Sequence, residues 1–350
     1  MDIKRIGIVG VGSIACGRHI PELLAIDNCQ ITAICDIDEN RLITVGDQLG
    51  IPHELRFTDY NDLIASTQVD AVEICTPNHL HIPIATAAVK YGKPVNIEKP
   101  LSINLAECQP LIHALKENPV ENMMCFTYRF MPAIRYAKWI LDKGLIGDII
   151  NVDVLYLKNS GFFKDRRLEW RFEKDKAGTG VLGDLGVHLI DMAELLVGKI
   201  SSVSAVTDIV VKQRKRLDSE EFANVETDDY CSFICNMENG VKGNFVISRC
   251  AIGHQGTVKY DVFGTKGIVS FDLNNPNVLN VCYGENDLVS EKIHTLDVPQ
   301  EFFTTQESEF IKMLQGDKYE ILPTVDDGLR SQKILDSILE SAEKRCWIDI

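Results

Sequence analysis

The sequence predicts an α/β N-terminal domain with a doubly wound parallel sheet and an α+β C-terminal domain with a large open, mainly antiparallel sheet. Three observations predict this architecture. The chain has 350 residues, which is long for a single domain. Up to about residue 126, short apolar runs alternate with helical patterns, as they do in parallel sheets. Beyond that point, longer alternating runs are joined by tight turns, which is typical of antiparallel sheets.

The first region, residues 1–126, is predicted to contain five strands with helices between them. The apolar runs that predict these strands lie near Ile6, near Ile31, and at residues 71–74, 95–97 and 123–126. Continuous apolar runs of this length are typical of strands buried on both faces. Because helices separate them, we expect the strands to be parallel.

The second region, residues 127–350, is predicted to begin with a helix at 133–143 and to end with a helix at about 325–344 whose apolar stripe packs back on the body. The strands expected between them are 149–157, 202–207, 230–237, 241–250, 257–264 and 268–272. Helices on one side leave the other face of such a sheet open. We therefore expect a homodimer or homotetramer formed through that face.

The turn that follows the first apolar run has the spacing of a dinucleotide-binding site. Gly10 can adopt the positive φ of a tight strand-to-helix turn, and Gly12 has no side chain to keep a pyrophosphate away from the helix N-terminus. Ser13 and Ile14 continue the turn, and Ala15 is small enough for close helix-strand packing. The first domain is therefore predicted to be a dinucleotide-binding Rossmann domain.

Asp36 ends the second apolar run, where a carboxylate can accept hydrogen bonds from both ribose hydroxyls of the adenosine half. The same carboxylate would repel a 2′-phosphate, and the nearest arginine, Arg41, is expected one turn into the next helix. The sequence therefore predicts NAD rather than NADP. An alternative is that Asp36 caps the helix that begins near Glu39.

Polar residues follow two further strands of the predicted parallel sheet, at the edge where ligands bind in such folds. Thr76, Pro77, Asn78 and His81 follow the strand at 71–74, and Glu98 and Lys99 follow the strand at 95–97. We expect all of them to contact the cofactor. His81 and its neighbour His79 could instead cap the helix start or lie on the surface. Lys99 could exchange a proton with the reacting oxygen or donate a hydrogen bond to it.

In the second domain, Asp184, His188 and Asp191 have the spacing of one helical face, beside an apolar stripe that can be buried. An aspartate and a histidine at this spacing could bind a metal ion, but no further ligands stand near them in the sequence. We therefore predict no metal site and assign this face to general acid-base chemistry.

Charge and composition exclude several classes of partner. The formal net charge of −15 argues against nucleic acid as a partner. The only dense cationic cluster in the sequence, residues 212–216, is expected in a solvated loop.

The sequence has no apolar stretch long enough to cross a membrane and no signal-peptide pattern before the first strand. The eleven cysteines form no C-x-x-C pair, and Cys231 and Cys235 are expected to pack in a strand with Phe233. We expect a cytoplasmic protein.

Several motifs occur together in a characteristic order. They are residues 10–15, Thr76-Pro77-Asn78 with His81, residues 98–100, 128–130, Trp170-Arg171, 184–191 and 263–267. In this combination the chain resembles the glucose-fructose oxidoreductase / inositol dehydrogenase family of nicotinamide enzymes. The resemblance implies that Lys99, Asp184 and His188 match the catalytic lysine, aspartate and histidine of family dehydrogenases that act on sugars or cyclitols. Thr179 departs from the glycine that the family often has there.

These observations favour an NAD-dependent oxidoreductase that transfers hydride between the nicotinamide and a secondary hydroxyl of a sugar, glycoside or cyclitol. In this hypothesis His188 is the general base, Lys99 binds the reacting oxygen, and Asp184 binds a neighbouring hydroxyl and orients His188. Further substrate contacts are expected from an aromatic and cationic set: Tyr128, Arg129, Phe162, Phe163, Trp170 and Arg171. One alternative is redox-neutral glycoside cleavage by oxidation and elimination with retained NAD. A second is a non-catalytic NAD-binding regulator.

Overall fold

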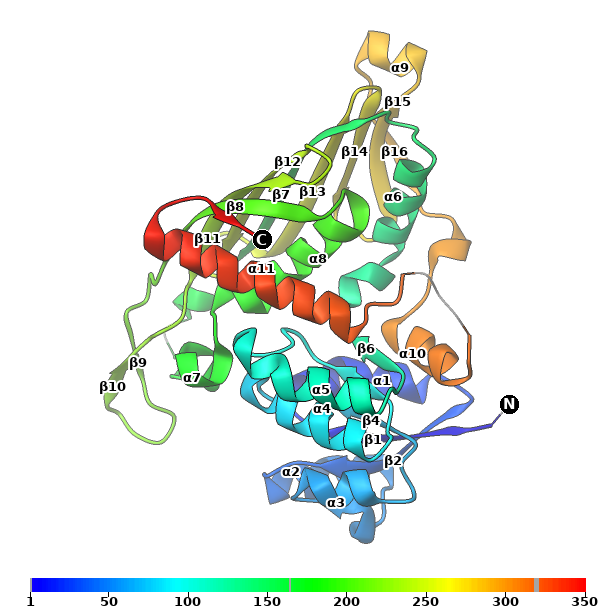
Figure 1. The fold of residues 1–350 in the computed structure, drawn as a ribbon, viewed down its shortest axis with the longest axis vertical. Coiled ribbons are helices and arrows are strands. Elements are labelled where there is room, and N and C mark those ends of the chain that lie inside the picture. Colours follow the sequence, from blue (N-terminus) through cyan, green and yellow to red (C-terminus); the bar gives the residue numbers. More distant parts are fainter. Residues whose placement is uncertain (1, 164, 318–320) are drawn as a thin grey trace. The chain divides into compact units, whose positions relative to one another are not determined.

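The computed structural model describes residues 2–163, 165–317 and 321–350, and the chain divides into two compact units (Figure 1). Unit 1 comprises Met1–Cys125 and Thr305–Leu329, and unit 2 comprises Phe126–Thr304 and Arg330–Ile350. The first boundary lies beside the expected one at residue 126. The segment Thr305–Leu329 differs from the expectation of a continuous second domain, because it packs in unit 1.

Unit 1 is built on a six-stranded parallel sheet with the strand order β3-β2-β1-β4-β5-β6. The order reverses between β1 and β4, and the crevice at such a switch point is where ligands bind in doubly wound folds. The predicted doubly wound sheet is therefore confirmed. The strands are β1 (Lys4–Val9), β2 (Cys29–Cys35), β3 (Arg56–Phe57), β4 (Ala71–Ile74), β5 (Val95–Ile97) and β6 (Asn122–Met124).

The helices of unit 1 begin and end at residues with recognisable capping roles. The helix α2 begins after Asp38, whose side chain accepts a hydrogen bond from the backbone N–H of Arg41, and ends at Gly50 with a φ of 66°. The first helical segment contains a π turn at Ala15–His19 before α1. The α-helices are α1 (Ile20–Leu24), α2 (Glu39–Leu49), α3 (Tyr60–Ala65), α4 (His81–Lys90), α5 (Gln109–Glu117) and α10 (Gln306–Leu314).

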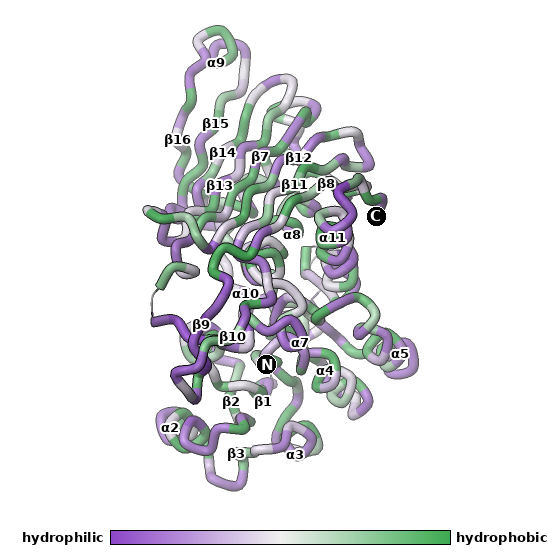
Figure 2. The backbone as a smooth tube through the Cα atoms, turned by 90° about the vertical axis from the view of Figure 1, so that its left-hand side faces the viewer, coloured by the Kyte–Doolittle hydropathy of each residue, from purple (hydrophilic) through white to green (hydrophobic). Residues whose placement is uncertain are grey.

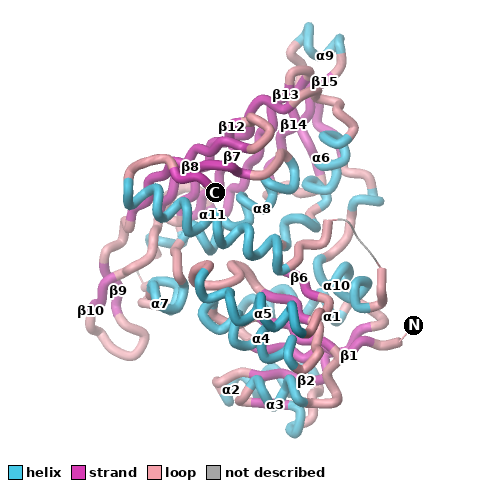
Figure 3. The backbone as a smooth tube through the Cα atoms, viewed as in Figure 1, coloured by secondary structure: helices cyan, strands magenta, loops and turns pink. Residues whose placement is uncertain are grey.

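Unit 2 contains a nine-stranded sheet with the order β16-β15-β14-β13-β7-β12-β11-β8-β17 (Figure 3). Among the described strands of this sheet, only β7 and β12 pair in parallel, and the predicted hairpins β11–β12 and β13–β14 are confirmed. The strands are β7 (Ile149–Lys158), β8 (Ile200–Asp208), β11 (Tyr230–Met237), β12 (Lys242–Ser248), β13 (Gln255–Gly264), β14 (Gly267–Asp272), β15 (Val278–Tyr283), β16 (His294–Asp297) and β17 (Ile348–Asp349).

The cationic cluster at residues 212–216 is partly solvated, as expected, since Lys212, Gln213 and Arg216 are exposed, but it is not a loop. Its residues form β9 (Gln213–Lys215), which pairs with β10 (Phe222–Asn224) in a separate two-stranded ribbon. Arg214 is buried, and its guanidinium carbon lies 4.3 Å from the centre of the Phe172 ring. The aliphatic and cationic parts of this side chain therefore pack inside unit 2 rather than in water.

Helices of unit 2 lie on one face of the large sheet, with α6 (Pro132–Asp142) contacting α8 (Val187–Leu196) and α8 contacting β7 (Figure 1). The short helices α7 (Lys174–Ala177) and α9 (Glu285–Ser290) stand apart from this pair. Residues along the strands alternate between hydrophobic and hydrophilic (Figure 2). Cys231, Phe233 and Cys235 are buried on the inner face of β11, as predicted.

The terminal helix α11 (Val325–Lys344) has the predicted bounds. In unit 2, Ile334, Leu335 and Ile338 are fully buried. The hydroxyl of Ser341 accepts a hydrogen bond from the backbone N–H of Ala205, at 3.0 Å. Among the residues that the structure describes, no helix is both long and apolar enough to cross a membrane.

Candidate active site

The glycine-rich turn of unit 1 has the geometry that a dinucleotide needs. Gly10 has a φ of +89°, and a Cβ atom there would lie 2.8 Å from the carbonyl oxygen of Cys75. A Cβ atom on Gly12 would have no heavy atom within 4 Å, so the space above this residue is open. Ser13 and Ile14, which start the helix, are exposed beside it. This turn can therefore accept a pyrophosphate against its backbone.

Asp36 is buried behind this turn and organises it. Its carboxylate accepts hydrogen bonds from the backbone N–H groups of Val11 and Asp38, both at 3.0 Å. The Nη1 atom of Arg41 donates to the same carboxylate, at 2.9 Å from Oδ2. Since Asp38 supplies the N-cap of α2, the alternative that Asp36 caps this helix is wrong.

The loop after β4 is held from within by His81. Its Nδ1 lies 2.8 Å from the carbonyl oxygen of Pro100, and its Nε2 lies 2.9 Å from the carbonyl oxygen of Thr76. Burial lowers the pKa of His81, although these two carbonyls act in the opposite direction. His81 therefore joins the loop that contains Thr76, Pro77 and the buried Asn78 to the loop after β5. Its direct contact with a cofactor stays a prediction.

Glu98 and Lys99 lie at the carboxyl end of β5, as the sequence predicted. The Glu98 side chain is buried, and its Oε2 accepts a hydrogen bond from the backbone N–H of Lys99, at 3.1 Å. The side chain of Lys99 is partly exposed. A buried carboxylate thus fixes the backbone of the residue whose amine is expected to act on the substrate.

In unit 2, Asp184 lies in a π turn, Leu182–Gly186, that leads directly into α8. The buried carboxylate of Asp228 accepts hydrogen bonds from two backbone N–H groups where this segment begins. They are those of Gly180, at 2.6 Å, and Leu182, at 2.8 Å. Widened turns of this kind are frequent at functional sites. The π turn also changes the regular helical spacing that the sequence analysis assumed between Asp184 and His188.

His188 is held by aromatic packing within unit 2. Its ring stacks on the ring of Tyr128, with a centroid separation of 4.4 Å and an angle of 21°. The hydroxyl of Tyr128 donates to the hydroxyl of Tyr156 on β7, at 3.0 Å. Burial, together with Tyr128, raises the pKa of Tyr156. Only 8% of His188 is exposed, so its orientation is set by the protein rather than by water.

Asp184, Arg171 and Trp170 form the more accessible part of the predicted site in unit 2. The Arg171 Nε lies 3.9 Å from Asp184 Oδ1, and both side chains are more than a third exposed. The guanidinium of Arg171 lies over the Trp170 ring, 4.3 Å from its centre. These groups can offer both hydrogen bonds and an aromatic surface to a polyol.

Arg129 and Asp191 pair with each other inside unit 2. The Nε of Arg129 lies 2.9 Å from Asp191 Oδ2, and both side chains are almost completely buried. A bidentate pair of this kind fixes the turn at Thr127–Phe130 against α8. This geometry favours a structural role for Arg129, and its predicted contact with substrate stays a prediction.

A pocket of about 300 Å³ lies elsewhere in unit 2, between the loop after β7 and the β9–β10 ribbon. Phe162, Phe163, Arg166, Arg214 and Phe222 are among the residues that line it, whereas Asp184 and His188 are not. The suspected substrate-facing segment Phe162–Phe163 therefore borders a pocket that the predicted catalytic residues do not line.

Two family models match the chain. Residues 4–126 match the oxidoreductase family with an NAD-binding Rossmann fold, and residues 134–270 match the GFO/IDH/MocA C-terminal domain. The chain belongs to the GFO/IDH/MocA oxidoreductase family. The resemblance found in the sequence is thereby confirmed, together with NAD as the cofactor and oxidoreductase chemistry.

Individual members of the family are similar over most of the chain. Levoglucosan dehydrogenase of Pseudarthrobacter phenanthrenivorans is 29% identical, covering 84% of this chain and 83% of its own. Glucose-6-phosphate 3-dehydrogenase of Bacillus subtilis is 28% identical, covering 97% of this chain and 96% of its own. A solved structure of levoglucosan dehydrogenase in complex with NADH and levoglucosan matches with a TM-score of 0.90 and 26% identity, covering 100% of both chains.

The residues of unit 1 fit the nicotinamide cofactor that the family binds. The open space above Gly12 would take the pyrophosphate, and the Asp36 carboxylate would take ribose hydroxyls. Thr76, whose buried Oγ1 has no hydrogen-bond partner within the described protein, lies in the loop at the switch point. A bound NAD+ supplies a hydride acceptor there.

Sequence reasoning missed several residues that organise the site. His19, Glu73 and Glu307 form a buried polar cluster next to Glu98, and Asp228 holds the start of the helix that carries Asp184. Glu307 lies on α10, far from the others in the chain. The only signal in the sequence was the charged residue within an otherwise apolar run, Glu73 in β4.

Proposed function

We propose that this protein oxidises a secondary hydroxyl of a sugar, glycoside or cyclitol to a ketone with NAD+ as the hydride acceptor. The dehydrogenase activities of its relatives support the reaction class. The single observation that carries the assignment of residues is the oriented ring of His188, which stacks on Tyr128 beside the π turn that contains Asp184.

His188 acts as the general base in this proposal. The stack on Tyr128 and the Tyr128–Tyr156 hydrogen bond restrict rotation of the imidazole, so one ring nitrogen keeps a constant direction. A positioned imidazole can accept the hydroxyl proton as the hydride leaves the same carbon. Asp184 binds a neighbouring hydroxyl, and Arg171 and Trp170 extend the surface that contacts the polyol.

Lys99 acts on the reacting oxygen. Its ammonium donates a hydrogen bond to that oxygen and stabilises the negative charge that develops as the proton leaves. Because Glu98 fixes the Lys99 backbone through a hydrogen bond of 3.1 Å, the lysine starts from a constrained position. This assignment rests on the match of residues 98–100 to the family motif and on their place at the end of β5.

The test follows the absorbance band of reduced nicotinamide while the purified protein and NAD+ are mixed with levoglucosan, glucose 6-phosphate, other hexoses, uronates, inositols and simple glycosides. We expect a substrate-dependent rise that falls by about 10²- to 10⁴-fold in His188→Ala and Lys99→Met. Lys116→Met, an exposed lysine on α5, is the matched control. A wild-type protein that stays silent while retaining bound NAD would favour redox-neutral cleavage or a regulator.

We also propose that the open face of the nine-stranded sheet forms a homodimer or homotetramer. Val206, Ser232 and Val246 are register partners on three adjacent strands of this face, and Val206 is 61% exposed. Ile234, nearby on β11, is 47% exposed. Exposed valine and isoleucine side chains on this face are suited to contact with a second sheet. Light scattering is expected to show an oligomer that Val206→Asp dissociates, and an unchanged mass would reject this face.

A cytoplasmic location is proposed on the basis of thiol chemistry. All eleven cysteines are free thiols, and most of them are buried in the two units. A chain with many free thiols is suited to a reducing compartment. Fractionation of cells that produce the protein is expected to recover it with cytoplasmic markers.

A further inference from the structure

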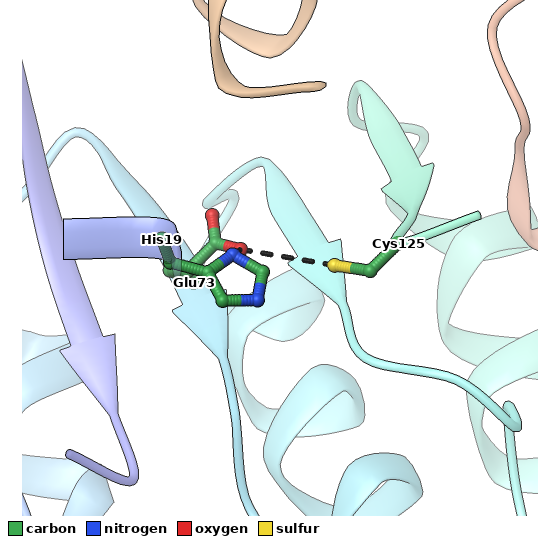
Figure 4. A group of neighbouring side chains, drawn as sticks. All are labelled: His19, Glu73 and Cys125. Atoms are coloured by element: carbon green, nitrogen blue, oxygen red, sulfur yellow. Dashed lines mark hydrogen bonds and ion pairs between the residues drawn. The ribbon is translucent and has the colours of Figure 1, made fainter. Parts of the chain in front are cut away.

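The core of unit 1 contains a histidine surrounded by carboxylates. The ring of His19 is fully buried, and its Nδ1 lies 2.8 Å from Glu307 Oε1 and 2.9 Å from Glu73 Oε1. Its Nε2 lies 3.0 Å from Glu98 Oε1. Figure 4 shows the His19 ring against the Glu73 carboxylate, with Cys125 approaching from the other side. Carboxylates from three separate elements therefore converge on one imidazole.

These contacts favour a protonated ring. A neutral imidazole has one N–H, whereas here both ring nitrogens face carboxylate oxygens, which accept hydrogen bonds. Burial alone would lower the pKa of His19, but Cys75, Glu73 and Glu307 together raise it well above its usual value. The imidazolium also offsets part of the negative charge that the buried glutamates would otherwise leave uncompensated.

Neutral amides fix the carboxylates around the ring. Asn96 Nδ2 donates to both oxygens of Glu73, at 2.9 and 3.1 Å. Gln306 Nε2 donates to Glu307 Oε1, at 2.9 Å. The cluster is therefore a connected network, and such a network holds each member in a single orientation.

The network ends at Lys99. Glu98 Oε1 faces the His19 ring, and Glu98 Oε2 accepts the hydrogen bond from the backbone N–H of Lys99. One carboxylate thus connects the imidazolium to the peptide group of the proposed substrate-binding lysine. If the His19 imidazolium were absent from Oε1, the Glu98 side chain would be held less firmly and could release that peptide group.

We propose that His19 is a positioning residue, which, anchored by Glu307 and Glu73, holds Glu98 in the orientation that fixes Lys99 for its contact with the reacting oxygen. The inference rests on the proposed function of Lys99. It assigns the segment that contains α10 a part in the site, because Glu307 anchors the ring.

A metal ion is the competing explanation. Ligand atoms of His19, Glu73 and Cys125 lie within 4.8 Å of one another. Zinc ligands lie about 2.0–2.3 Å from the ion in a tetrahedron, which keeps ligand atoms farther apart than hydrogen-bonded ones. The separations of 2.8–3.0 Å around the His19 ring are those of hydrogen bonds. The geometry therefore favours the imidazolium.

The first test is hydrogen-deuterium exchange of the full-length protein, read in the peptide that contains the Lys99 amide. In His19→Gln and Glu307→Gln we expect exchange of this peptide to accelerate about tenfold or more, because the Glu98–Lys99 hydrogen bond opens more often. The peptides of β1 and β2 are expected to keep their wild-type rates. His113→Gln, an exposed histidine on α5, is the control. An unchanged rate for the Lys99 peptide in both folded variants would overturn the inference.

The second test uses whichever substrate of the panel the wild-type protein oxidises. We expect kcat to fall by about 10- to 100-fold in His19→Gln, since small misplacements of a reacting group have effects of this size. KM for NAD+ is expected to change far less. The pKa seen in the pH profile of kcat should rise in this variant. Removing the positive charge of the His19 ring makes it easier for neighbouring groups to bind a proton. A general loss of stability would not produce this shift.

The outcomes separate the two proposals. If Lys99→Met retains activity, the proposed function of Lys99 fails whatever His19→Gln does. If Lys99→Met is inactive but His19→Gln keeps the wild-type kcat and pH profile, only the positioning role fails. One equivalent of zinc in the purified protein, lost in Cys125→Ser, would also overturn the positioning role and establish a metal site.

Discussion

The Asp36 carboxylate is the group expected to decide whether NAD+ or NADP+ binds. It is buried behind the glycine turn, and it accepts hydrogen bonds from the Val11 backbone and from Arg41. A ribose with two free hydroxyls can share this carboxylate, whereas a 2′-phosphate would be repelled by it. If the Asp36 carboxylate were removed, the Arg41 guanidinium beside it could attract a 2′-phosphate.

Replacing Asp36 by Ser is expected to reduce the preference for NAD+ over NADP+. Hydrogen bonds to a charged group contribute about 1.5–3 kcal/mol, so affinity for NAD+ should fall by about 10- to 100-fold. Binding of NADP+ should improve, because Arg41 loses its 2.9 Å ion pair with Asp36 and keeps only the longer contact with Asp38, at 3.5 Å. Titration of both cofactors by fluorescence measures the ratio. Asp62→Asn, an exposed aspartate on α3, is the control and should leave the ratio unchanged.

The Arg129–Asp191 pair shows how a residue suited to substrate binding can be used inside the fold. Both side chains are buried and bonded to each other at 2.9 Å. Removing one partner would leave the other charge buried without this ion pair. Loss of either partner should therefore lower the stability of unit 2.

Arg129→Met is therefore expected to lower the free energy of unfolding by about 3–5 kcal/mol. Chemical denaturation monitored by tryptophan fluorescence measures this change. The double variant Arg129→Met, Asp191→Leu should regain part of the loss, because no charge stays buried. A single variant with wild-type stability but a raised KM for substrate would instead support the contact predicted from the sequence.

At the scale of elements, the helix that carries Asp184 and His188 depends on how it begins. The Asp228 carboxylate and backbone carbonyl accept hydrogen bonds from Gly180, Val181 and Leu182. These contacts bring the two backbones so close that a Cβ atom on Gly180 would lie 1.9 Å from the Asp228 carbonyl oxygen. The absence of a side chain at this position is therefore a packing requirement.

Gly180→Ala is expected to destabilise the protein by about 1–3 kcal/mol, the usual range for forcing an extra group into a packed site. Activity should fall further than stability predicts, because the displaced segment carries Asp184. Thermal unfolding and steady-state kinetics on the same preparation measure both effects. Gly17→Ala provides the comparison, since a Cβ atom there has no neighbour within 4 Å and stability should be kept.

Elements were predictable where the pattern of apolar residues decides them. The strands at 71–74, 95–97 and 230–237 and the helix at 325–344 have the predicted bounds. Strands β3, β9, β10, β15, β16 and β17 were missed. Strands β3 and β17 have only two residues each, and β9, β10 and β16 carry no continuous apolar run. Strand β15, by contrast, buries Leu279 and Val281, and its apolar pattern was overlooked. The π turn at Asp184 was also missed, since it depends on the contacts with Asp228 rather than on the local sequence.

The site was predictable only where motifs mark it. The glycine turn, Asp36 and Lys99 lie at strand ends, as expected. Three sets of contacts join segments that are distant in the sequence. They are the hydrogen bond of His81 to Pro100, the stack of Tyr128 on His188, and the contacts of His19 with its carboxylates. The local pattern of residue types does not reveal which distant polar groups become neighbours, so these contacts could not be derived from motifs and spacing.

At the scale of the whole molecule, the chain returns to unit 1 at Thr305 before its last residues, Arg330–Ile350, complete unit 2. The segment Thr305–Leu329 adds α10 to unit 1, where Glu307 enters the core beside His19. Burying this many ionisable groups makes the stability of unit 1 depend on pH. The direction of that dependence follows from the pKa of His19, which is well above its ordinary value because of Cys75, Glu73 and Glu307.

The free energy of unfolding of unit 1 is expected to fall as the pH rises above about 6.5. In the unfolded chain His19 has its ordinary pKa of about 6.5. Below that pH the ring is protonated in both states, and its stabilising contribution is fully present. Above it, the folded state binds more protons than the unfolded state, so stability decreases until the pH passes the pKa of the folded protein.

The ionisable groups around His19 do not reverse this fall of stability with rising pH. Burial and the carboxylate of Glu307 raise the pKa of Glu73 to about 7, so Glu73 also makes stability fall with rising pH, between its ordinary pKa and that value. The pKa of His81 is lowered, so His81 acts only below this window. The thermal midpoint of the wild type should therefore fall between pH 6.5 and 9 more steeply than that of His19→Gln. Parallel curves for these two proteins would show that the ring is not an imidazolium, and His113→Gln should follow the wild type.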